Sequence, residues 1–428
     1  MLFRSVAVVG MREVLGKARR SGKEELLCRT TRRCYAPGAL TNFESQLAAE
    51  LAELRAANLL RELRRVESPV GTRATIAGRE LLNFSANDYL GLANHSALKE
   101  AATKAVAAYG AGSGASRLVC GSLAVHHELE EALADFKGTE AALTFSTGYA
   151  AAQGVITALL GKGDVLIVDK LVHACIVDAA KLCGAKLRVF RHNDLTDLEA
   201  KLKWASKQAA NAERGARNLS PRVLVVTESV FSMDGDLAPL RNLVELKERY
   251  GAWLMVDEAH ATGLFGERRS GLVEEFGLTG RVEIQMATLG KAIGAAGGAI
   301  CGSRKLIDLL VNRARSFIFS TGPVPAAAAA ARAGVELIRS QEGETRRQRL
   351  WLLVEELKRV LISAGFPPSA VRAPIVPVVV GAEARAVKLS AALREAGVFV
   401  PAIRFRSEEH TSELQSHHDL VCRLLLEK

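Results

Sequence analysis

The chain has 428 residues, of which 49% are hydrophobic and 24% are charged, with a formal net charge of +10. These values fit a globular protein of one large or two ordinary domains. No apolar run approaches the roughly 18 residues that a membrane-spanning helix needs. The seven cysteines show no CxxC pair or recurring spacing, which argues against a disulfide framework or a zinc site and favours a reducing compartment, the cytoplasm.

Much of the positive charge lies near the N-terminus. Residues 1–39 hold nine Lys and Arg against three Asp and Glu, whereas residues 406–428 hold three against five. A basic surplus spread over a folded face would predict a nucleic-acid or anionic-membrane partner. Because the surplus is concentrated in a tail, we expect neither partner.

Both ends of the chain resemble translated sequencing adapter. Residues 2–5 read Leu-Phe-Arg-Ser and residues 406–409 read Arg-Ser-Glu-Glu, the translations of one adapter in its two orientations. We therefore expect residues 1–39 to be a non-native or disordered tail and 406–428 to be a foreign tail, with the natural chain inside about 6–405. An arginine-rich organelle presequence is the alternative for the N-terminus, although its three acidic residues count against it.

Hydrophobic periodicity predicts a first helix from Thr41 to Arg65, capped by Thr41 or Asn42, and then a short strand and a polar turn within 79–91. From Ser96 the chain alternates between the two kinds of element. Helices are predicted at 96–109, 124–137, 148–160 and 173–183, and strands at 141–145, 164–169, 186–190, 222–229, 252–257, 283–287 and 297–301. This order predicts an α/β fold whose mainly parallel sheet is covered on both faces and binds ligands at the carboxyl ends of its strands.

A smaller α+β lobe is predicted to follow. Its helices are expected at 324–340, 345–363 and 384–396, and its strands at 374–380 and 398–403. We divide the chain into an N-terminal helix and strand segment (40–90), a large domain (91–323) and a small domain (324–405). Because this lobe stops at Phe405 without material to cover its sheet, we expect it to be truncated and to expose a strand edge.

Lys291 is the residue around which a site is predicted. It lies among Thr288, Gly290 and Gly294, and glycine lets the backbone approach a bulky ligand closely. This is the setting of a lysine that forms a Schiff base. The ordinary interpretation is a solvated lysine in a glycine-rich turn. The sequence Asp257-Glu-Ala-His260, which ends an apolar strand upstream, disfavours it.

The Asp257 to His260 motif allows three interpretations. A zinc site would need two histidines on one helix face, and a serine hydrolase would need a Gly-x-Ser-x-Gly elbow; neither is present. We therefore predict no metal. The third interpretation is a buried carboxylate that faces a protonated ring nitrogen, because a buried carboxylate needs a cationic partner.

Two glycine-rich segments resemble nucleotide motifs but do not fit them. Residues 110–115 follow a helix, whereas the dinucleotide fingerprint follows a strand. Gly290 and Lys291 lack the first glycine and the Ser or Thr of a P-loop, since Gln285 and Ala292 stand at those positions. We therefore predict neither motif.

A longer set of motifs carries a family resemblance. The set comprises Asn87-Asp-Tyr-Leu-Gly-Leu92, Gly112-Ser-Gly-Ala-Ser-Arg117, Gly121, His126, Thr147-Gly-Tyr-Ala150, His173-Ala174, Glu228-Ser-Val-Phe-Ser-Met-Asp-Gly-Asp236, Asp257-Glu-Ala-His260 and Thr288-Leu-Gly-Lys291. In this order, over about residues 40–404, the chain resembles the α-oxoamine synthases. The resemblance implies pyridoxal 5'-phosphate as cofactor and the aspartate-aminotransferase fold, fold type I.

The resemblance also implies catalytic roles. Lys291 would hold the cofactor as a Schiff base and then remove the α-proton of the amino acid. Asp257 would pair with the pyridinium nitrogen, and His260 would bind near the phenolic oxygen. His173 would stack on the ring and contact the substrate; its ordinary interpretation is an exposed residue at a helix N-terminus.

Further binding roles follow from the same resemblance. Gly148 and Tyr149 would donate backbone N–H groups to the phosphate at a helix N-terminus, where an anion is favoured. Thr288 would add a hydroxyl, and Ser232 would bind near the phenolic oxygen. Arg61 would contact the acyl substrate. The ordinary interpretations are a turn former for Ser232 and a charge on a surface helix for Arg61.

The activity implied is the decarboxylating condensation of L-alanine with pimeloyl-CoA or the corresponding acyl carrier protein. Sister enzymes that use glycine or serine are the nearest alternative, and an inactive cofactor-binding fragment is another. The resemblance further implies a homodimer in which the turns 87–92 and 320–322 reach the site of the neighbour. After Arg404 the family's proline-rich turn, substrate-binding arginine and final helix are missing, so we expect this chain to be weakly active or inactive.

Overall fold

The computed structural model describes residues 42–211, 221–366, 368, 372–403 and 421–425. The chain divides into two compact units at Leu60. Of the predicted tails, residues 1–39 and most of 406–428 lie outside the described residues. None of the described helices is both long and apolar enough to span a membrane.

The first unit contains helix α3 (Phe43–Ala56). As predicted, Asn42 caps this helix, because its side chain accepts a hydrogen bond from the Glu44 N–H at 3.1 Å. The predicted continuation to Arg65 is wrong. The helix ends at Ala56, and Asn58 adopts a left-handed φ of 58°.

The second unit is built on a seven-stranded sheet in the order β3-β9-β8-β7-β6-β4-β5. The strands are β3 (Ala141–Phe145), β4 (Val165–Asp169), β5 (Lys186–Phe190), β6 (Val223–Glu228), β7 (Trp253–Asp257), β8 (Ile284–Thr288) and β9 (Gly298–Gly302). Strand β9 alone runs antiparallel to the other six strands of this sheet, so the predicted mainly parallel sheet is confirmed. Its apolar strands are buried along nearly their whole length, as in sheets covered on both faces.

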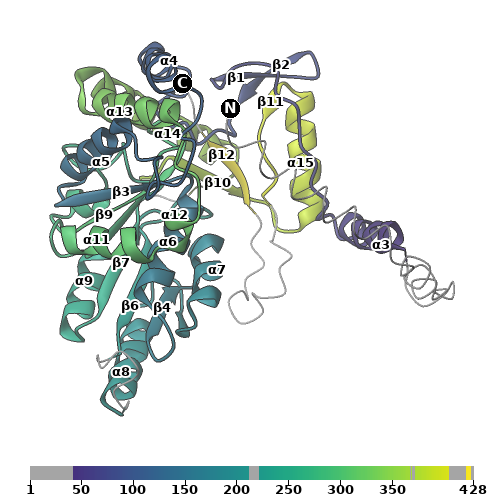
Figure 1. The fold of residues 1–428 in the computed structure, drawn as a ribbon. Coiled ribbons are helices and arrows are strands. Elements are labelled where there is room, and N and C mark those ends of the chain that lie inside the picture. Colours follow the sequence, from purple (N-terminus) through teal and green to yellow (C-terminus); the bar gives the residue numbers. More distant parts are fainter. Residues whose placement is uncertain (1–41, 212–220, 367, 369–371, 404–420, 426–428) are drawn as a thin grey trace, which may run out of the picture. The chain divides into compact units, whose positions relative to one another are not determined.

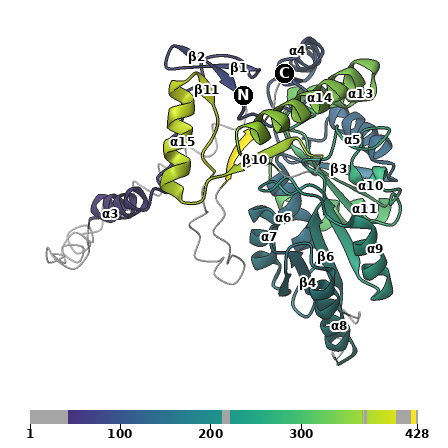
Figure 2. The same cartoon turned by 180° about the vertical axis from the view of Figure 1, so that it is seen from behind.

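Helices cover both faces of this sheet (Figures 1 and 2). On one face, the core contains residues of α6 (Gly148–Leu159), α7 (Ala174–Cys183), α11 (Arg304–Arg313) and α12 (Arg315–Ile318). The core on the other face contains residues of α4 (Ser96–Tyr109), α5 (Ala124–Lys137), α8 (Leu195–Asn211), α9 (Leu240–Arg249), α10 (Leu272–Glu275), α13 (Pro325–Arg339) and α14 (Gln341–Ser363). Helix α13 packs on α4 and α5, and therefore belongs to the core beside the large sheet.

The smaller sheets join segments that are far apart in the chain. Strands β1 (Arg73–Ile76) and β2 (Arg79–Asn83) form a hairpin, and β2 pairs in parallel with β11 (Val398–Phe399). The strand predicted at 398–403 thus has only two residues. Helix α15 (Glu383–Glu395) packs against β11.

The expectation of an exposed edge in the small lobe is wrong at one strand. Strand β10 (Ile375–Val379) pairs antiparallel with β12 (Val421–Leu425), in a register from Ile375 opposite Leu425 to Val379 opposite Val421. Part of the segment that resembles adapter therefore occupies this edge.

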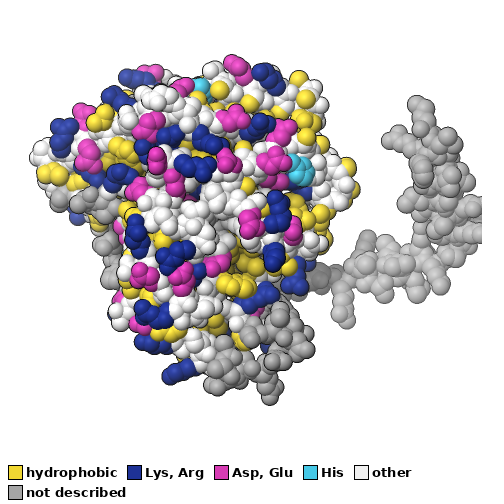
Figure 3. Space-filling view, turned by 90° about the vertical axis from the view of Figure 1, so that its left-hand side faces the viewer, with side chains coloured by type: hydrophobic (Ala, Val, Ile, Leu, Met, Phe, Trp, Pro, Cys, Tyr) yellow, Lys and Arg dark blue, Asp and Glu magenta, His cyan; other side chains and the backbone are white. Residues whose placement is uncertain are grey.

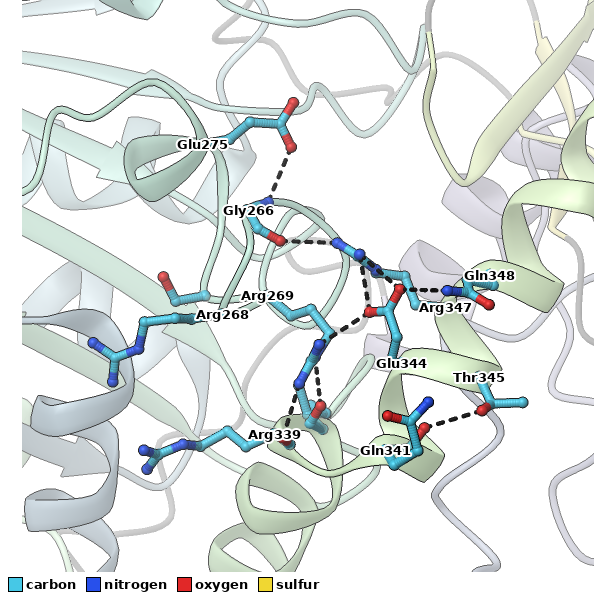
Figure 4. A network of polar contacts seen from close by, with 12 residues as sticks. Gly266, Arg268, Arg269, Glu275, Arg339, Gln341, Glu344, Thr345, Arg347 and Gln348 are labelled. Carbon is cyan, nitrogen blue, oxygen red and sulfur yellow. Dashed lines mark hydrogen bonds and ion pairs between the residues drawn. The ribbon is translucent and has the colours of Figure 1, made fainter.

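A polar network fixes the loop between β7 and β8 to the start of α14 (Figure 4). Arg269 donates hydrogen bonds to two carbonyls at the C-terminal end of α13 and to Glu344 at 2.9 Å. Arg347 donates to the carbonyl of Gly266 at 2.8 Å and to Glu344 at 2.9 Å. The loop that follows Asp257 is therefore attached to α13 and α14.

On the surface shown in Figure 3, basic and acidic side chains are interspersed.

Candidate active site

The candidate site lies at the carboxyl ends of three neighbouring strands. Glu228, Asp257 and Thr288 are the last residues of β6, β7 and β8, and Lys291 follows β8 by three residues. The strand register places Glu228 directly beside Asp257. Ligands of parallel α/β sheets bind at this edge. The fold thus assembles residues that are separated by up to 63 positions in the chain.

Lys291 belongs to a line of polar side chains. Its Nζ lies 2.7 Å from Nε2 of His260, and the hydroxyl of Tyr89 lies 2.5 Å from Nδ1 of the same ring. Tyr89 and His260 are buried. The histidine is therefore held from both sides, and it can pass a proton between the lysine and the phenol.

Tyr89 was not predicted as a site residue. The motif Asn87 to Leu92 was recognised, but its turn was expected to reach the site of a neighbouring subunit. In the structure, Tyr89 contacts His260 of its own chain. The aromatic residue within a recognised motif was the signal that could have identified it.

Asp257 carries a buried carboxyl group, which a nearby cation would stabilise. Burial raises its pKa, while the nearby Lys291 acts in the opposite direction. Its Oδ1 accepts a hydrogen bond from the Ala259 N–H at 2.9 Å. Since a buried carboxylate is costly without a cationic partner, a ligand with a protonated ring nitrogen would suit this position.

Glu228 provides a second buried carboxyl beside Asp257. Burial, and then the charge of Asp257, raise the pKa of Glu228 to about 8, while Lys291 opposes the shift. Its Oε2 accepts a long hydrogen bond from the Ser232 N–H at 3.3 Å, and its Oε1 has no partner among the described residues. An unpaired buried oxygen of this kind fits a site that is completed by a polar ligand.

The predicted anion-binding end is formed by the start of α6 and the end of β8. A Cβ atom on Gly148 would lie 2.6 Å from Cγ2 of Thr288, so a side chain there would displace the threonine. Thr288 Oγ1 is buried and has no partner among the described residues. The first amides of a helix have no partners within the helix, and they favour an anion. A phosphate therefore fits here.

The backbone of Tyr149 lies in the first turn of α6, at this predicted anion-binding end. Its hydroxyl turns away to donate a hydrogen bond to Asp178 at 2.7 Å, and this bond raises the pKa of the phenol. The side chain is 44% exposed.

His173 caps helix α7, so its ordinary interpretation as a helix N-terminal residue is correct in part. Its Nδ1 accepts a hydrogen bond from the Cys175 N–H at 3.2 Å. The backbone of His173 is close enough to Glu228 to lower the pKa of that carboxyl, which places it at the candidate site. Burial raises the pKa of the Cys175 thiol, so this cysteine stays protonated.

Two predicted residues have weaker support from the geometry. Ser232 lies in a turn, and its contact with the site is the backbone hydrogen bond to Glu228. Arg61 is exposed in an irregular segment and makes no hydrogen bond or ion pair with the residues that the structure describes. The structure does not bring Arg61 to the other site residues.

A second charged group anchors the loop that carries Ser232. Nδ1 of His192 lies 2.9 Å from Oδ1 of Asp169, and Nε2 of the same ring lies 2.8 Å from Oδ2 of Asp236. Burial alone would lower the pKa of His192, but the hydrogen bonds to both carboxylates raise it to about 10. The side chains of His192, Asp234 and Asp236 lie close enough together to hold a metal ion. A histidine that binds a metal must be deprotonated, however, whereas the two carboxylates favour the protonated ring. The arrangement instead favours an imidazolium held between two acids.

Replacing His192 with glutamine is expected to lower the melting temperature, most strongly at low pH. A raised pKa means that the protonated ring stabilises the folded state. This contribution is complete below the ordinary pKa of 6.5 and is lost as the pH rises through about 10. Calorimetry of both proteins across this range measures it. A difference in melting temperature that does not change with pH contradicts the assignment.

The fold and the site are those of a pyridoxal-phosphate enzyme of fold type I, in agreement with the relatives of the chain. The chain matches the family Aminotransferase class I and II over residues 79–412, and it belongs to that family. It is 48% identical over 358 residues to the 8-amino-7-oxononanoate synthase of Geobacter sulfurreducens, covering 84% of this chain and 88% of that protein. The same enzyme from Geotalea daltonii is 48% identical over 355 residues, with 83% and 88% covered.

A solved structure shows the same fold. The serine palmitoyltransferase of S. paucimobilis, with bound PLP and myriocin, superposes with a TM-score of 0.80 at 28% identity. The superposition covers 90% of this chain and 94% of the other. The predicted fold class and family are confirmed.

Proposed function

We propose that the chain catalyses the decarboxylating condensation of L-alanine with pimeloyl-CoA or pimeloyl carrier protein, which yields 8-amino-7-oxononanoate for biotin biosynthesis. The observation that carries this proposal is the site at the ends of β6, β7 and β8, in a chain 48% identical to enzymes of that name.

The residues fit pyridoxal phosphate as cofactor. When bound, this group attaches to a lysine and withdraws electrons from the α-carbon of an amino acid. Asp257 would face its ring nitrogen, while Thr288 and the amides of Gly148 and Tyr149 would hold its phosphate. The orphaned oxygens of Thr288 and Glu228 support this placement. His173 and Ser232 would line the ring, as the sequence predicts.

Lys291 would act as the base that takes the α-proton. Its position beside His260 supports this role, because the ring of His260 can accept or return a proton at Nε2. Tyr89 would hold the opposite ring nitrogen, and thus the orientation of the imidazole. Arg61 remains a proposed contact of the acyl substrate.

A sister enzyme that uses serine or glycine is the second candidate, favoured by the similarity to serine palmitoyltransferase. The lower identity of 28% makes it the weaker one. An assay of thiol release from pimeloyl-CoA or palmitoyl-CoA, with L-alanine, glycine or L-serine, separates them. We expect the fastest release and the mass of 8-amino-7-oxononanoate from alanine and pimeloyl-CoA. Faster turnover of serine would overturn the assignment, and cofactor binding without any thiol release would identify an inactive fragment.

We also propose that the protein is a cytoplasmic homodimer. Leu118, Val119 and Phe319 are 52%, 78% and 70% exposed. Their segments lie side by side through the bridge between Ser116 and Thr321. A second copy would bury this apolar surface. The free thiols of Cys120, Cys175, Cys183 and Cys301 suit a reducing compartment.

Val119→Asp combined with Phe319→Asp is expected to convert the dimer into a monomer, because charges would enter the apolar interface. Sedimentation velocity measures the change. The control is Leu352→Asp, which changes another exposed apolar residue and should leave the dimer intact. A wild-type monomer would contradict the proposal.

A further inference from the structure

A fully buried lysine contacts the loop that follows Asp257. Lys137 is the last residue of α5, and its side chain is 0% exposed. Its Nζ donates hydrogen bonds to Glu258 Oε2 at 2.9 Å, to Thr262 Oγ1 at 2.8 Å and to the Ser270 carbonyl at 2.5 Å. All three donors of the ammonium group are therefore used. Lysine is almost never fully buried unless it is paired in this way.

The partner of Lys137 begins the turn that carries the site residues. Glu258 directly follows Asp257 and precedes His260 by two positions. Its Oε1 accepts a hydrogen bond from the Val273 N–H at 2.9 Å, and its own N–H donates to the Met286 carbonyl at 2.9 Å. The carboxylate thus ties this turn to the loop that follows it and, through Lys137, to α5.

The fold leaves space for this carboxylate. Gly271 has a φ of 147°, and a Cβ there would lie 2.4 Å from Glu258 Oε1. Any larger residue at this position would displace the glutamate. Lys137 and Glu258 hold the β7–β8 loop from its buried side, and the ion pair between Arg269 and Glu344 holds it from the side of α14.

The pair also shapes the charge around Asp257. After burial and Lys291, the groups that act on the pKa of Asp257 include Glu258, which raises it, and Lys137, which lowers it. Because the two influences oppose each other, the pair together affects the pKa of Asp257 less than Glu258 alone would. Glu258 without Lys137 would place an unpaired negative charge next to Asp257.

We propose that Lys137 is a positioning residue, which through Glu258 holds the Asp257 to His260 turn and cancels the charge of Glu258 beside Asp257. This inference rests on the proposed function, since it assumes that Asp257 faces the cofactor. Lys137 itself touches neither cofactor nor substrate. Its contribution is the geometry and charge of a residue that does.

The test compares the affinity for pyridoxal phosphate of apoenzyme variants, measured by fluorescence quenching. Lys137→Met should weaken binding about tenfold, which corresponds to about 1.4 kcal/mol. The double variant Lys137→Met with Glu258→Gln loses both partners of the ion pair, and therefore no longer has an unpaired negative charge at position 258. It should bind within about threefold of the wild type. A role in stability alone would instead make the double variant no better than the single one.

The matched control is the pair Lys247 and Glu283 at the opposite end of β7, whose side chains lie 2.6 Å apart. There, too, the glutamate accepts a backbone hydrogen bond, from the Leu254 N–H. Lys247→Met with Glu283→Gln should lower the melting temperature without changing cofactor affinity. Unchanged affinity in Lys137→Met, or equal loss in the single and double variants, overturns the proposal.

Two further outcomes are distinguishable. If Lys137→Met does not fold, the double variant decides the matter, since a loss above about tenfold there contradicts charge cancellation. If the wild-type apoenzyme itself binds no pyridoxal phosphate, the proposed function fails, and the positioning role fails with it. Tight binding by the wild type keeps the two questions separate.

Discussion

Replacing Lys291 with alanine is expected to abolish turnover while leaving the protein folded. The residue follows a buried strand, but its side chain points to His260 rather than into the core. Its loss should therefore cost little stability. It removes both the covalent attachment of the cofactor and the base for the α-proton, and general base catalysis alone contributes about 10²–10⁴-fold. Thiol release and circular dichroism measure the two effects.

Two controls accompany this variant. Lys291→Arg keeps a positive charge near Glu228 and Asp257 but cannot form a Schiff base, so it should be as inactive as the alanine variant. Lys162→Ala changes an exposed lysine in a turn and should behave as the wild type does. Turnover of Lys291→Ala within about tenfold of the wild type would refute the role of this lysine.

Replacing Asp257 with asparagine is expected to slow α-proton removal by about 10²-fold or more. Asparagine keeps the size and can still accept the hydrogen bond from the Ala259 N–H, so the turn should persist. It removes the charge that would hold the ring nitrogen protonated, and with it most of the electron withdrawal. Exchange of the α-proton of alanine in deuterated water, followed by NMR, measures this step without the acyl substrate.

Glu228→Gln is a control in the same surroundings. Because burial and the charge of Asp257 raise the pKa of Glu228, its neutral form is favoured, and glutamine imitates that form. We therefore expect a much smaller loss of exchange than in Asp257→Asn. Equal losses in the two variants would show that the charge of Asp257 has no special role.

Local sequence patterns were sufficient for several elements. The bounds predicted for α4 and α5 agree with the structure, because each helix has an apolar face and stops at a glycine, Gly110 or Gly138. The strands of the large sheet were found as short apolar runs. Since their carboxyl ends meet at one edge, placing Asp257 and Lys291 there also predicted that they would come together.

Other elements were missed or overextended for physical reasons. Helices α8, α9 and α11 were not predicted, although α9 carries apolar residues at helical spacing, Leu240, Leu243 and Val244. The leucines that suggested a helix to Arg65 have the correct spacing, but Leu63 is fully exposed. Since none of the residues of α3 is buried either, exposure does not explain the stop; the left-handed backbone of Asn58, just after the helix, is the local feature that ends it.

The contacts that complete the site could not be predicted from local patterns. Tyr89 meets His260 across 171 positions, and Lys137 meets Glu258 across 121. Neither pair has a spacing rule, because the contact depends on where the fold brings two distant segments. Sequence reasoning could therefore identify the residues at strand ends but not the side chains that hold them.

The central claim is that Lys291 holds pyridoxal phosphate at the ends of β7 and β8. The most direct test is to reduce the loaded protein with borohydride, digest it and map the pyridoxyl group by mass spectrometry. We predict that the group lies on Lys291 and is absent from the same peptide of Lys291→Ala. A pyridoxyl group on another lysine, or none on a protein that has bound the cofactor, would contradict the account.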